Sequence, residues 1–246
     1  MIYVFVIQFI LLIFAWSIYY HRGIAHNHIK FSRPLDWFFR SIFYMFGTGS
    51  DKYWMKYLVA QHRLHHATSG SHLDPISLKH NFMNAAFPVL SKRLGIHTYN
   101  ISDHDVYRYG KDIKPYEDWI QRNIFSFKHG PIIFNIVLYG LVTSSILYAI
   151  VMPFLLFFTA MIFMPVLANI VTHGFGINLG YGKNYKNDDS KNIIPFGIFM
   201  FGEELHNNHH NYPNKVNFAI RKFEIDLGYL MMVLLEKVNL LKIKRT

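Results

Sequence analysis

The chain has 246 residues, of which 52% are hydrophobic and none is cysteine. The absence of cysteine excludes disulfides, thiolate zinc sites, iron–sulfur clusters and thiol nucleophiles, so a bound metal must use nitrogen and oxygen ligands. The formal net charge of +10 favours anionic lipid head groups or acidic partners. Nucleic acid is not expected as a partner, because no dense basic tract or nucleic-acid-binding motif is present.

Two stretches of the chain carry no charge: Ile2 to Tyr20, and residues 131–171. An apolar helix needs about 20 residues to cross the hydrocarbon core of a bilayer. We therefore expect three membrane spans, at about 2–20, 132–151 and 153–171. Pro153 is expected near the tip of a tight hairpin. A signal peptide is disfavoured for the first stretch, because no basic residue precedes it and no small-residue cleavage site follows it.

All 25 Lys and Arg residues lie outside the expected spans. By the positive-inside tendency, segments 21–130 and 172–246 belong on the cytoplasmic side. The sequence thus predicts a single-domain, all-α integral membrane protein over residues 1–246, with about three transmembrane helices capped by a cytoplasmic helical domain.

Within the cytoplasmic segments, apolar spacing predicts helices over Leu35 to Met45 and Tyr53 to Ala60. The first of these is not taken as a fourth span, because Arg40 interrupts it. A short linker helix is expected to begin at 115–118, where Pro is followed by acidic residues. Residues 174–192 predict a loop, and residues 223–241 an amphipathic helix.

Eight of the 15 histidines fall into three short clusters. These are His21-Arg-Gly-Ile-Ala-His26, His62-Arg-Leu-His65-His66 and His206-Asn-Asn-His209-His210. Positions i, i+3 and i+4 of a helix share one face, so the second and third clusters can each direct three imidazoles at one point. His21 and His26 lie about 140° apart on an ideal helix. Their convergence needs a helix end or a distortion, for which Gly23 is a suitable position.

Isolated histidines are more often interfacial or hydrogen-bonded side chains than ligands, and we assign that role to His28, His72, His80, His97, His104 and His129. The clustered histidines differ, because so many adjacent imidazoles are stable chiefly when neutral and bound to a cation. Their number exceeds what one ion accepts, so a dimetal site is expected. Imidazole suits zinc, copper, iron and nickel. A structural zinc site would close at four ligands, and haem ligands would lie within the spans, so iron is favoured.

These motifs, in this order and with a long apolar hairpin between the second and third, resemble the membrane fatty-acyl desaturases of the delta-9, stearoyl-CoA-desaturase-like type in a short bacterial form. The resemblance extends to Asp74-Pro75, to the Gly202-Glu-Glu-Leu lead-in, to Tyr212-Pro213 and to the segment 223–229. The Glu-Glu-Leu-His-Asn-Asn form of the third box and Leu58, one turn before His62, depart from the acyl-CoA enzymes. Both departures bear on the acyl carrier more than on the chemistry.

The resemblance implies a non-haem di-iron centre whose ligands are His21, His26, His62, His65, His66, His173, His206, His209 and His210. His173 enters through the family's Asn-x-x-x-His element, in which Asn169 would bind metal through a water. No catalytic residue is expected beyond these ligands. Arg22 and Arg63 each follow a ligand, and they are expected either to hold carboxylates such as Asp74, Glu203, Glu204 or Asp226, or simply to supply cytoplasmic charge.

By the same resemblance, we expect an O2-dependent insertion of a cis double bond, at the delta-9 position, into a saturated acyl chain carried on CoA or a lipid. The cofactors would be two Fe ions cycling between Fe2+ and Fe3+, with O2 as co-substrate. A separate electron donor is implied, of the ferredoxin, flavodoxin or cytochrome b5 type with its reductase. The expected location is the bacterial inner membrane, as a multi-pass protein among membrane lipids with its active site on the cytoplasmic face.

Two alternatives remain open from the sequence. A related histidine-box membrane di-iron hydroxylase or ketolase would share the metal site but add oxygen to the substrate. A non-catalytic metal or haem transport protein would place ionisable groups along its spans. Asn135 and Asn169 are the only amide or ionisable residues in the expected hairpin, which disfavours transport.

Overall fold

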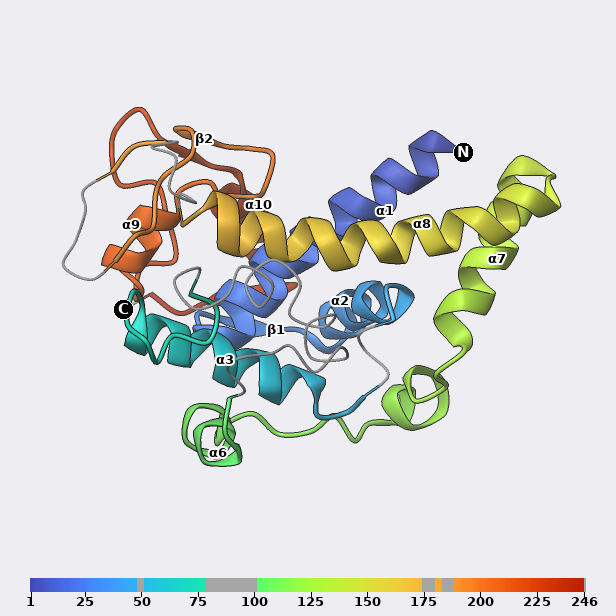
Figure 1. The fold of residues 1–246 in the computed structure, drawn as a ribbon, viewed down its shortest axis with the longest axis horizontal. Helices are drawn as coiled ribbons and strands as arrows, with labels where there is room; N and C mark the ends of the chain where they lie inside the picture. Colours follow the sequence, from blue (N-terminus) through green and yellow to red (C-terminus); the bar gives the residue numbers. More distant parts are fainter. Residues whose placement is uncertain (48–50, 78–100, 174–179, 183–187, 246) are drawn as a thin grey trace.

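The computed structural model describes residues 1–47, 51–77, 101–173, 180–182 and 188–245. Within these ranges the chain is mostly helical, with two short two-stranded sheets (Figure 1). The helices are α1 (Ile2–Phe14), η1 (Ala15–Ala25), α2 (Arg33–Met45), α3 (Trp54–Thr68), α6 (Asp103–Gly110), η2 (Gln121–Phe125), α7 (Gly130–Thr143), α8 (Ile146–Pro165), η3 (Val166–Val171), α9 (His206–Asn211) and α10 (Leu227–Lys237). The strands are β1 (Ile29–Phe31), β2 (Phe196–Gly197), β3 (Ile225–Asp226) and β4 (Leu241–Ile243).

Two helices of the described chain are long and apolar enough to cross a membrane, Ile2–Ala25 and Ile146–Phe163. The first joins α1 and η1 without a break and so extends past the predicted end at Tyr20. The third apolar helix, α7, has 14 residues and is shorter than a typical span. Of the three expected spans, two therefore correspond to helices that are long enough to cross a membrane, and the third corresponds to the shorter α7.

The predicted position of the hairpin turn was wrong. Helix α7 ends at Thr143 and α8 begins at Ile146, so the turn is at Ser144–Ser145 and Pro153 lies inside α8. Ser144 adopts a left-handed conformation with φ of 51°, which closes the turn. The sequence did not reveal this because both helices are uncharged, and proline in an apolar helix is tolerated where neighbouring helices compensate.

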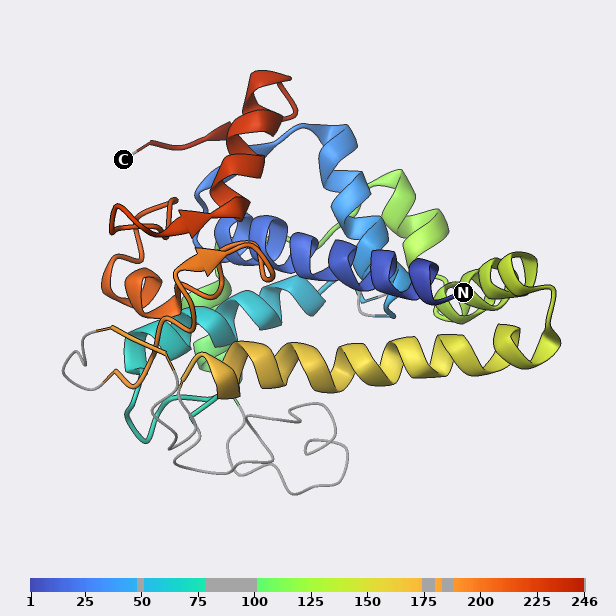
Figure 2. The ribbon, with the colours of Figure 1, turned by 90° about the horizontal axis from the view of Figure 1, so that it is seen from above.

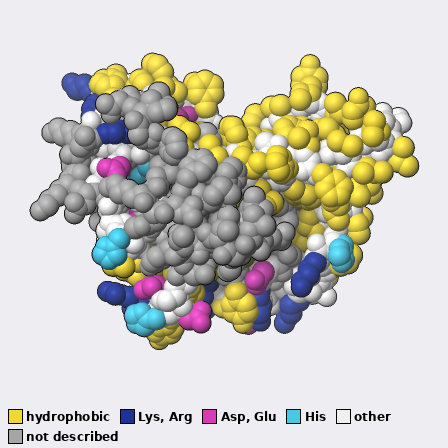
Figure 3. Space-filling view, in the orientation of Figure 1, with side chains coloured by type: hydrophobic (Ala, Val, Ile, Leu, Met, Phe, Trp, Pro, Cys, Tyr) yellow, Lys and Arg dark blue, Asp and Glu magenta, His cyan; other side chains and the backbone are white. Residues whose placement is uncertain are grey.

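Helices α1 and α8 lie side by side, and α7 packs against α8 (Figures 1 and 2). Hydrophobic side chains cover the surface around α7 and α8 on the right of Figure 3, whereas charged and histidine side chains gather at the left and lower edges. Large apolar side chains on the outer faces are strongly exposed, including Leu141 at 78%, Ile146 at 81% and Phe158 at 64%. Such a surface is suited to lipid contact.

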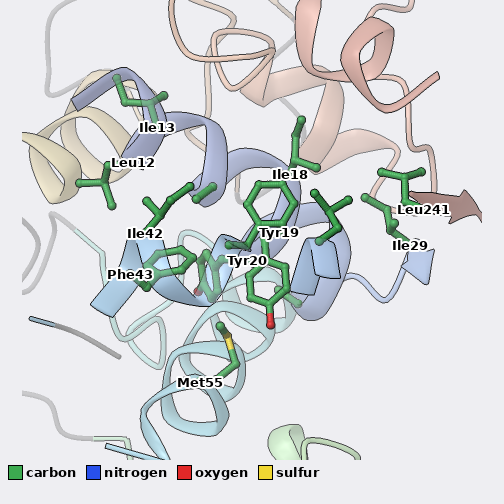
Figure 4. Packing of buried hydrophobic residues seen from close by; sticks show 14 of the residues in the cluster. Leu12, Ile13, Ile18, Tyr19, Tyr20, Ile29, Ile42, Phe43, Met55 and Leu241 are labelled. Atoms are coloured by element: carbon green, nitrogen blue, oxygen red, sulfur yellow. The ribbon is translucent and has the colours of Figure 1, made fainter. Parts of the chain in front are cut away.

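The core lies at the junction of η1 with α2 and α3. Figure 4 shows Tyr19 and Tyr20 of η1 packed with Phe43 of α2 and Met55 of α3. The predicted helices over Leu35 to Met45 and Tyr53 to Ala60 are confirmed as α2 and α3. This core fixes η1 against α3, the two elements that carry the first and second histidine clusters.

The last part of the chain returns to the same region. Strand β4 pairs antiparallel with β1, and β2 pairs in parallel with β3. The helix predicted over 223–241 is confined to α10, because the side chain of Asp226 caps it by accepting a hydrogen bond from the Tyr229 amide and strands occupy both flanks. The linker helix begins close to the predicted position, where Asp118 accepts a hydrogen bond from the Gln121 amide. The loop predicted over 174–192 lies largely outside the described residues.

Candidate metal centre

The structure gathers nine histidines into two adjacent groups. His21, His26, His62, His66 and His209 form a five-histidine group, and His65, His173, His206 and His210 form a four-histidine group. Within each group one ring nitrogen of every histidine lies within 4.8 Å of those of the others. All nine residues proposed as ligands from the sequence are thus brought together, including His173.

The first cluster converges through a distortion of the helix that carries it. Residues Ala15–Ala25 form a π-helix, in which the backbone amide of His26 donates to the carbonyl of His21 at 3.0 Å. The wider turn brings positions i and i+5 to one face, so the two imidazole rings lie 5.1 Å apart. Gly23 permits this geometry, because a Cβ there would lie 2.4 Å from the Phe31 ring.

The other ligand candidates come from three helix ends. His62, His65 and His66 lie in the last two turns of α3, and residues 206–210 lie on α9. The i, i+3, i+4 spacing divides each cluster between the groups, since His65 and His210 join one group while His66 and His209 join the other. His173 follows η3 at the end of α8. These elements meet at the left of Figures 1 and 2.

The close approach of the ring nitrogens fits cations at both positions. Nε2 of His209 lies 3.0 Å from Nε2 of His21 and 3.0 Å from Nε2 of His66. Two more Nε2–Nε2 pairs are as close, His26–His62 at 2.9 Å and His206–His173 at 3.2 Å. Neutral imidazoles pointing lone pairs at one another are stabilised by a shared cation. In the four-histidine group Nε2 of His65 and Nε2 of His210 are buried with no hydrogen-bond partner, which suits metal ligation.

Carboxylates orient three of these rings, and those of Glu203 and Asp74 are buried. Glu203 Oε2 lies 2.6 Å from Nδ1 of His21, and Asp74 Oδ1 lies 2.9 Å from Nδ1 of His65. Asp188 Oδ1 lies 3.3 Å from Nδ1 of His210. A carboxylate that accepts the Nδ1 proton leaves the Nε2 lone pair free for a metal.

The contacts of Glu203 and Asp74 differ from those predicted, because they bind histidines rather than arginines. Arg22 does pair with Asp226, at 3.1 Å, but Arg63 pairs with Asp112. Glu204 accepts the backbone amides of Phe199 and Met200. Asp188 was missed, since nothing distinguishes it among the polar residues of its loop.

Burial keeps the imidazoles neutral. Desolvation, followed by repulsion from neighbouring imidazoles, lowers the pKa of His62, His66, His206, His209 and His210 well below the usual value. Burial lowers the pKa of His173 to about 3. Burial alone would raise the pKa of Glu203, but contact with His21 outweighs it and holds that pKa below its usual range. At neutral pH these six histidines are therefore uncharged nitrogen donors, and the Glu203 carboxylate is ionised.

Asn169 is buried in η3, one turn before His173. Within the described chain, none of His28, His72, His104 and His129 belongs to either group. His28 is nevertheless buried, with its ring 5.4 Å from that of His26. The remaining two histidines of that set, His80 and His97, lie outside the described residues.

A family model described as fatty acid desaturase matches residues 1–223. The chain therefore belongs to the fatty acid desaturase family. It is 27% identical over 230 residues to an sn-1 stearoyl-lipid 9-desaturase of Synechocystis sp., covering 91% of this chain and 64% of that protein. It is 24% identical over 241 residues to Delta-9 acyl-lipid desaturase 1 of Arabidopsis thaliana, covering 91% and 68%.

By their names, the related proteins differ in the position of the double bond and in the carrier of the acyl chain. An acyl-CoA 5-desaturase of Anemone leveillei is 23% identical over 235 residues, covering 93% of this chain and 66% of that protein. The chain thus spans about two thirds of the length of these relatives.

Proposed function

We propose that this protein is an O2-dependent fatty-acyl desaturase that inserts a cis double bond, at the delta-9 position, into a saturated chain. The observation that carries the proposal is the pair of histidine groups, in which carboxylates hold Nδ1 of His21 and His65, and Nε2 of His65 and His210 is buried without a hydrogen-bond partner. Membership of the family supports desaturation over the hydroxylase and ketolase alternatives.

The nine histidines are the proposed ligands of two iron ions, and Asn169 is proposed to act through a water. Breaking an unactivated C–H bond is beyond any side-chain acid or base, and iron with dioxygen supplies the needed oxidising power. Glu203, Asp74 and Asp188 keep three rings in the orientation that presents Nε2. Arg63 holds the first and second clusters in register, because its guanidinium donates to the carbonyl of Ala25 at 2.7 Å.

The delta-9 position is the proposal that the two acyl-lipid relatives suggest by name, and a delta-5 outcome is the alternative that the Anemone relative raises. The acyl carrier is proposed to be a membrane lipid or CoA. A separate one-electron donor is required, and the basic cytoplasmic side of this chain would suit an acidic carrier. We place the protein in the bacterial inner membrane, with α1 and the α7–α8 hairpin in the bilayer and the histidine groups on the cytoplasmic side.

Expression in a host that lacks unsaturated fatty acids of this kind tests the proposal. Gas chromatography and mass spectrometry of the extracted fatty acids should show a new monounsaturated chain with its double bond at carbon 9. His65→Ala should abolish it, whereas His104→Ala, which alters an exposed histidine, should not. No new unsaturation in a host with a competent donor, or activity retained by His65→Ala, would contradict the proposal.

A further inference from the structure

The two histidine groups lie in different electrostatic surroundings. The four-histidine group has two carboxylates against its rings, Asp74 on His65 and Asp188 on His210. Over the parts of the chain that the structure describes, neither carboxylate forms an ion pair with a lysine or arginine. Asp188 also accepts hydrogen bonds from the Ser190 hydroxyl at 2.7 Å and the Ser69 hydroxyl at 3.2 Å, which hold it in place without cancelling its charge.

Among the described residues, the five-histidine group has one carboxylate against its rings, that of Glu203, and Arg22 lies close to this carboxylate. Arg22 is fully buried, and the attraction of its charge is one reason that the pKa of Glu203 is low. Its guanidinium carbon lies 3.8 Å from the centre of the Phe218 ring, and that ring lies 4.4 Å from the His209 ring. A fixed positive charge therefore stands one aromatic ring away from a proposed ligand.

A second arginine approaches the same group. Arg63 donates to the carbonyls of Ala25 and Ile24, next to His26, and its charge contributes to the lowered pKa of His26. Its partner Asp112 is about half exposed, so water screens that carboxylate more than it screens the inner groups. Arg22 is also paired with a carboxylate, that of Asp226, which at the same time caps the start of α10.

We propose that the two groups bind divalent cations with unequal affinity, the four-histidine group being the tighter site and the five-histidine group the weaker one. This inference rests on the proposed dimetal function. A cation is attracted by each nearby carboxylate and repelled by each nearby guanidinium, and these effects are strong where water is excluded. The number of uncharged ligands does not distinguish the two sites, because the weaker site has a fifth imidazole and the tighter site has Asn169 as its proposed fifth ligand.

Zinc titration of the chelator-treated protein, in competition with a coloured zinc indicator, tests this inference. Wild type should bind one zinc ion at low free zinc and a second only at free zinc at least about tenfold higher. Asp74→Asn and Asp188→Asn should each weaken the first step by about 10- to 100-fold, the usual effect of losing such a partner. Glu203→Gln should weaken the second step alone.

Substitutions of Arg22 distinguish an electrostatic role from a structural one, because the two roles predict opposite changes in zinc affinity at the second step. In the folded protein Arg22→Gln should tighten the second step, even though loss of the buried pair with Asp226 lowers the stability of the variant, because a cation is removed while the ligands remain. Arg22→Lys should leave the second step near wild type. A purely structural role would instead weaken the step in both variants. Asp118→Asn, which alters a carboxylate paired with the buried Arg40 of α2, is the matched control and should change neither step.

Two equal binding steps in wild type, or weakening of the tighter step by Glu203→Gln and not by Asp74→Asn, would overturn the inference while leaving the dimetal centre intact. Failure of wild type to bind zinc at all would overturn the proposed centre itself. The two failures are therefore distinguishable in one titration.

Discussion

At the scale of single residues, the centre is held by charges that water does not reach. Arg22 and Asp226 form a buried ion pair with side-chain exposures of 0% and 1%. Glycine at 202 and 228 makes room for this arginine, since a Cβ at either position would lie within 2.7 Å of its guanidinium nitrogens. The pair joins η1, which carries the first cluster, to the start of α10.

Arg22→Met should destabilise the protein strongly, because it leaves Asp226 buried without its cation. Breaking such a pair typically costs about 3 to 5 kcal/mol. Arg245→Met is the control, since its pairing with Glu236 is on the surface and such pairs contribute less than about 1 kcal/mol. Chemical unfolding in detergent measures both. Equal losses in the two variants would contradict the stabilising role of burial at this pair.

The buried histidines also predict how stability depends on pH. Their pKa values are lowered in the folded protein, whereas the unfolded chain takes up protons near the ordinary value of about 6.5. The unfolded state therefore binds more protons below that pH, and the stability of the metal-free protein should fall as the pH drops from 7 towards 5. Thermal unfolding after chelation checks this prediction. A midpoint that is constant over this range would show that the imidazoles are not buried as described.

At the scale of elements, a distorted helix brings together the two histidines of the first cluster. An ideal helix would separate His21 from His26, and the π-helical η1 brings them to one face. The turn depends on Gly23, because the Phe31 ring that fills the space beside it also packs against Tyr19, with ring centres 5.0 Å apart.

Gly23→Ala should therefore destabilise the protein and reduce its metal content. The added Cβ would lie 2.9 Å from the carbonyl oxygen of Ile18, which belongs to the same helix and cannot move freely. Overpacking of this kind costs about 1 to 3 kcal/mol.

Gly140→Ala is the matched control, because its Cβ would meet only Ala149 at 3.5 Å, an ordinary contact. That variant should be neutral or slightly more stable. Metal analysis and thermal unfolding report both effects, and a fully metal-loaded Gly23→Ala protein would contradict the need for the distorted turn.

At the scale of the whole molecule, the α7–α8 turn and the histidine groups lie at opposite ends. Figure 3 shows the hydrophobic surface over α7 and α8, away from the end where α3 and α9 meet. A buried polar contact ties the apolar helices together, since the Gln8 amide donates to Asn135 at 2.7 Å and Tyr139 donates to Gln8 at 2.7 Å. Each of these polar groups among apolar helices thus has its partner.

The absence of native cysteine allows a direct test of this topology. Ile146→Cys lies at the α7–α8 turn, and Tyr107→Cys lies on α6, and both positions are well exposed. In intact bacterial cells whose outer membrane is made permeable, a membrane-impermeant maleimide should label the first variant. It should label the second only after the inner membrane is opened. Labelling of both variants from the same side would contradict the proposed arrangement.

The sequence predicted the histidine site better than the boundaries of the spans. Spacing of i, i+3 and i+4 predicted helices for the second and third clusters, and α3 and α9 confirm the helices. The expectation that each cluster directs its three imidazoles at one point was wrong, because His65 and His209 each join the other group. The division of each cluster between two groups could not be predicted, because it depends on how distant helices cross. The turn at Ser144 was missed because uncharged sequence on both sides gives no polarity signal, and Asp188 was missed because its partner is remote in the chain.

The mass of the product tests the central claim most directly. The purified protein, loaded with iron and supplied with oxygen, a reducing system and a saturated acyl substrate on lipid or on CoA, should return a chain that has lost two hydrogen atoms. The double bond should lie at carbon 9, and no product should form without oxygen. A chain that has gained an oxygen atom instead would identify a hydroxylase and contradict desaturation as the activity of this protein.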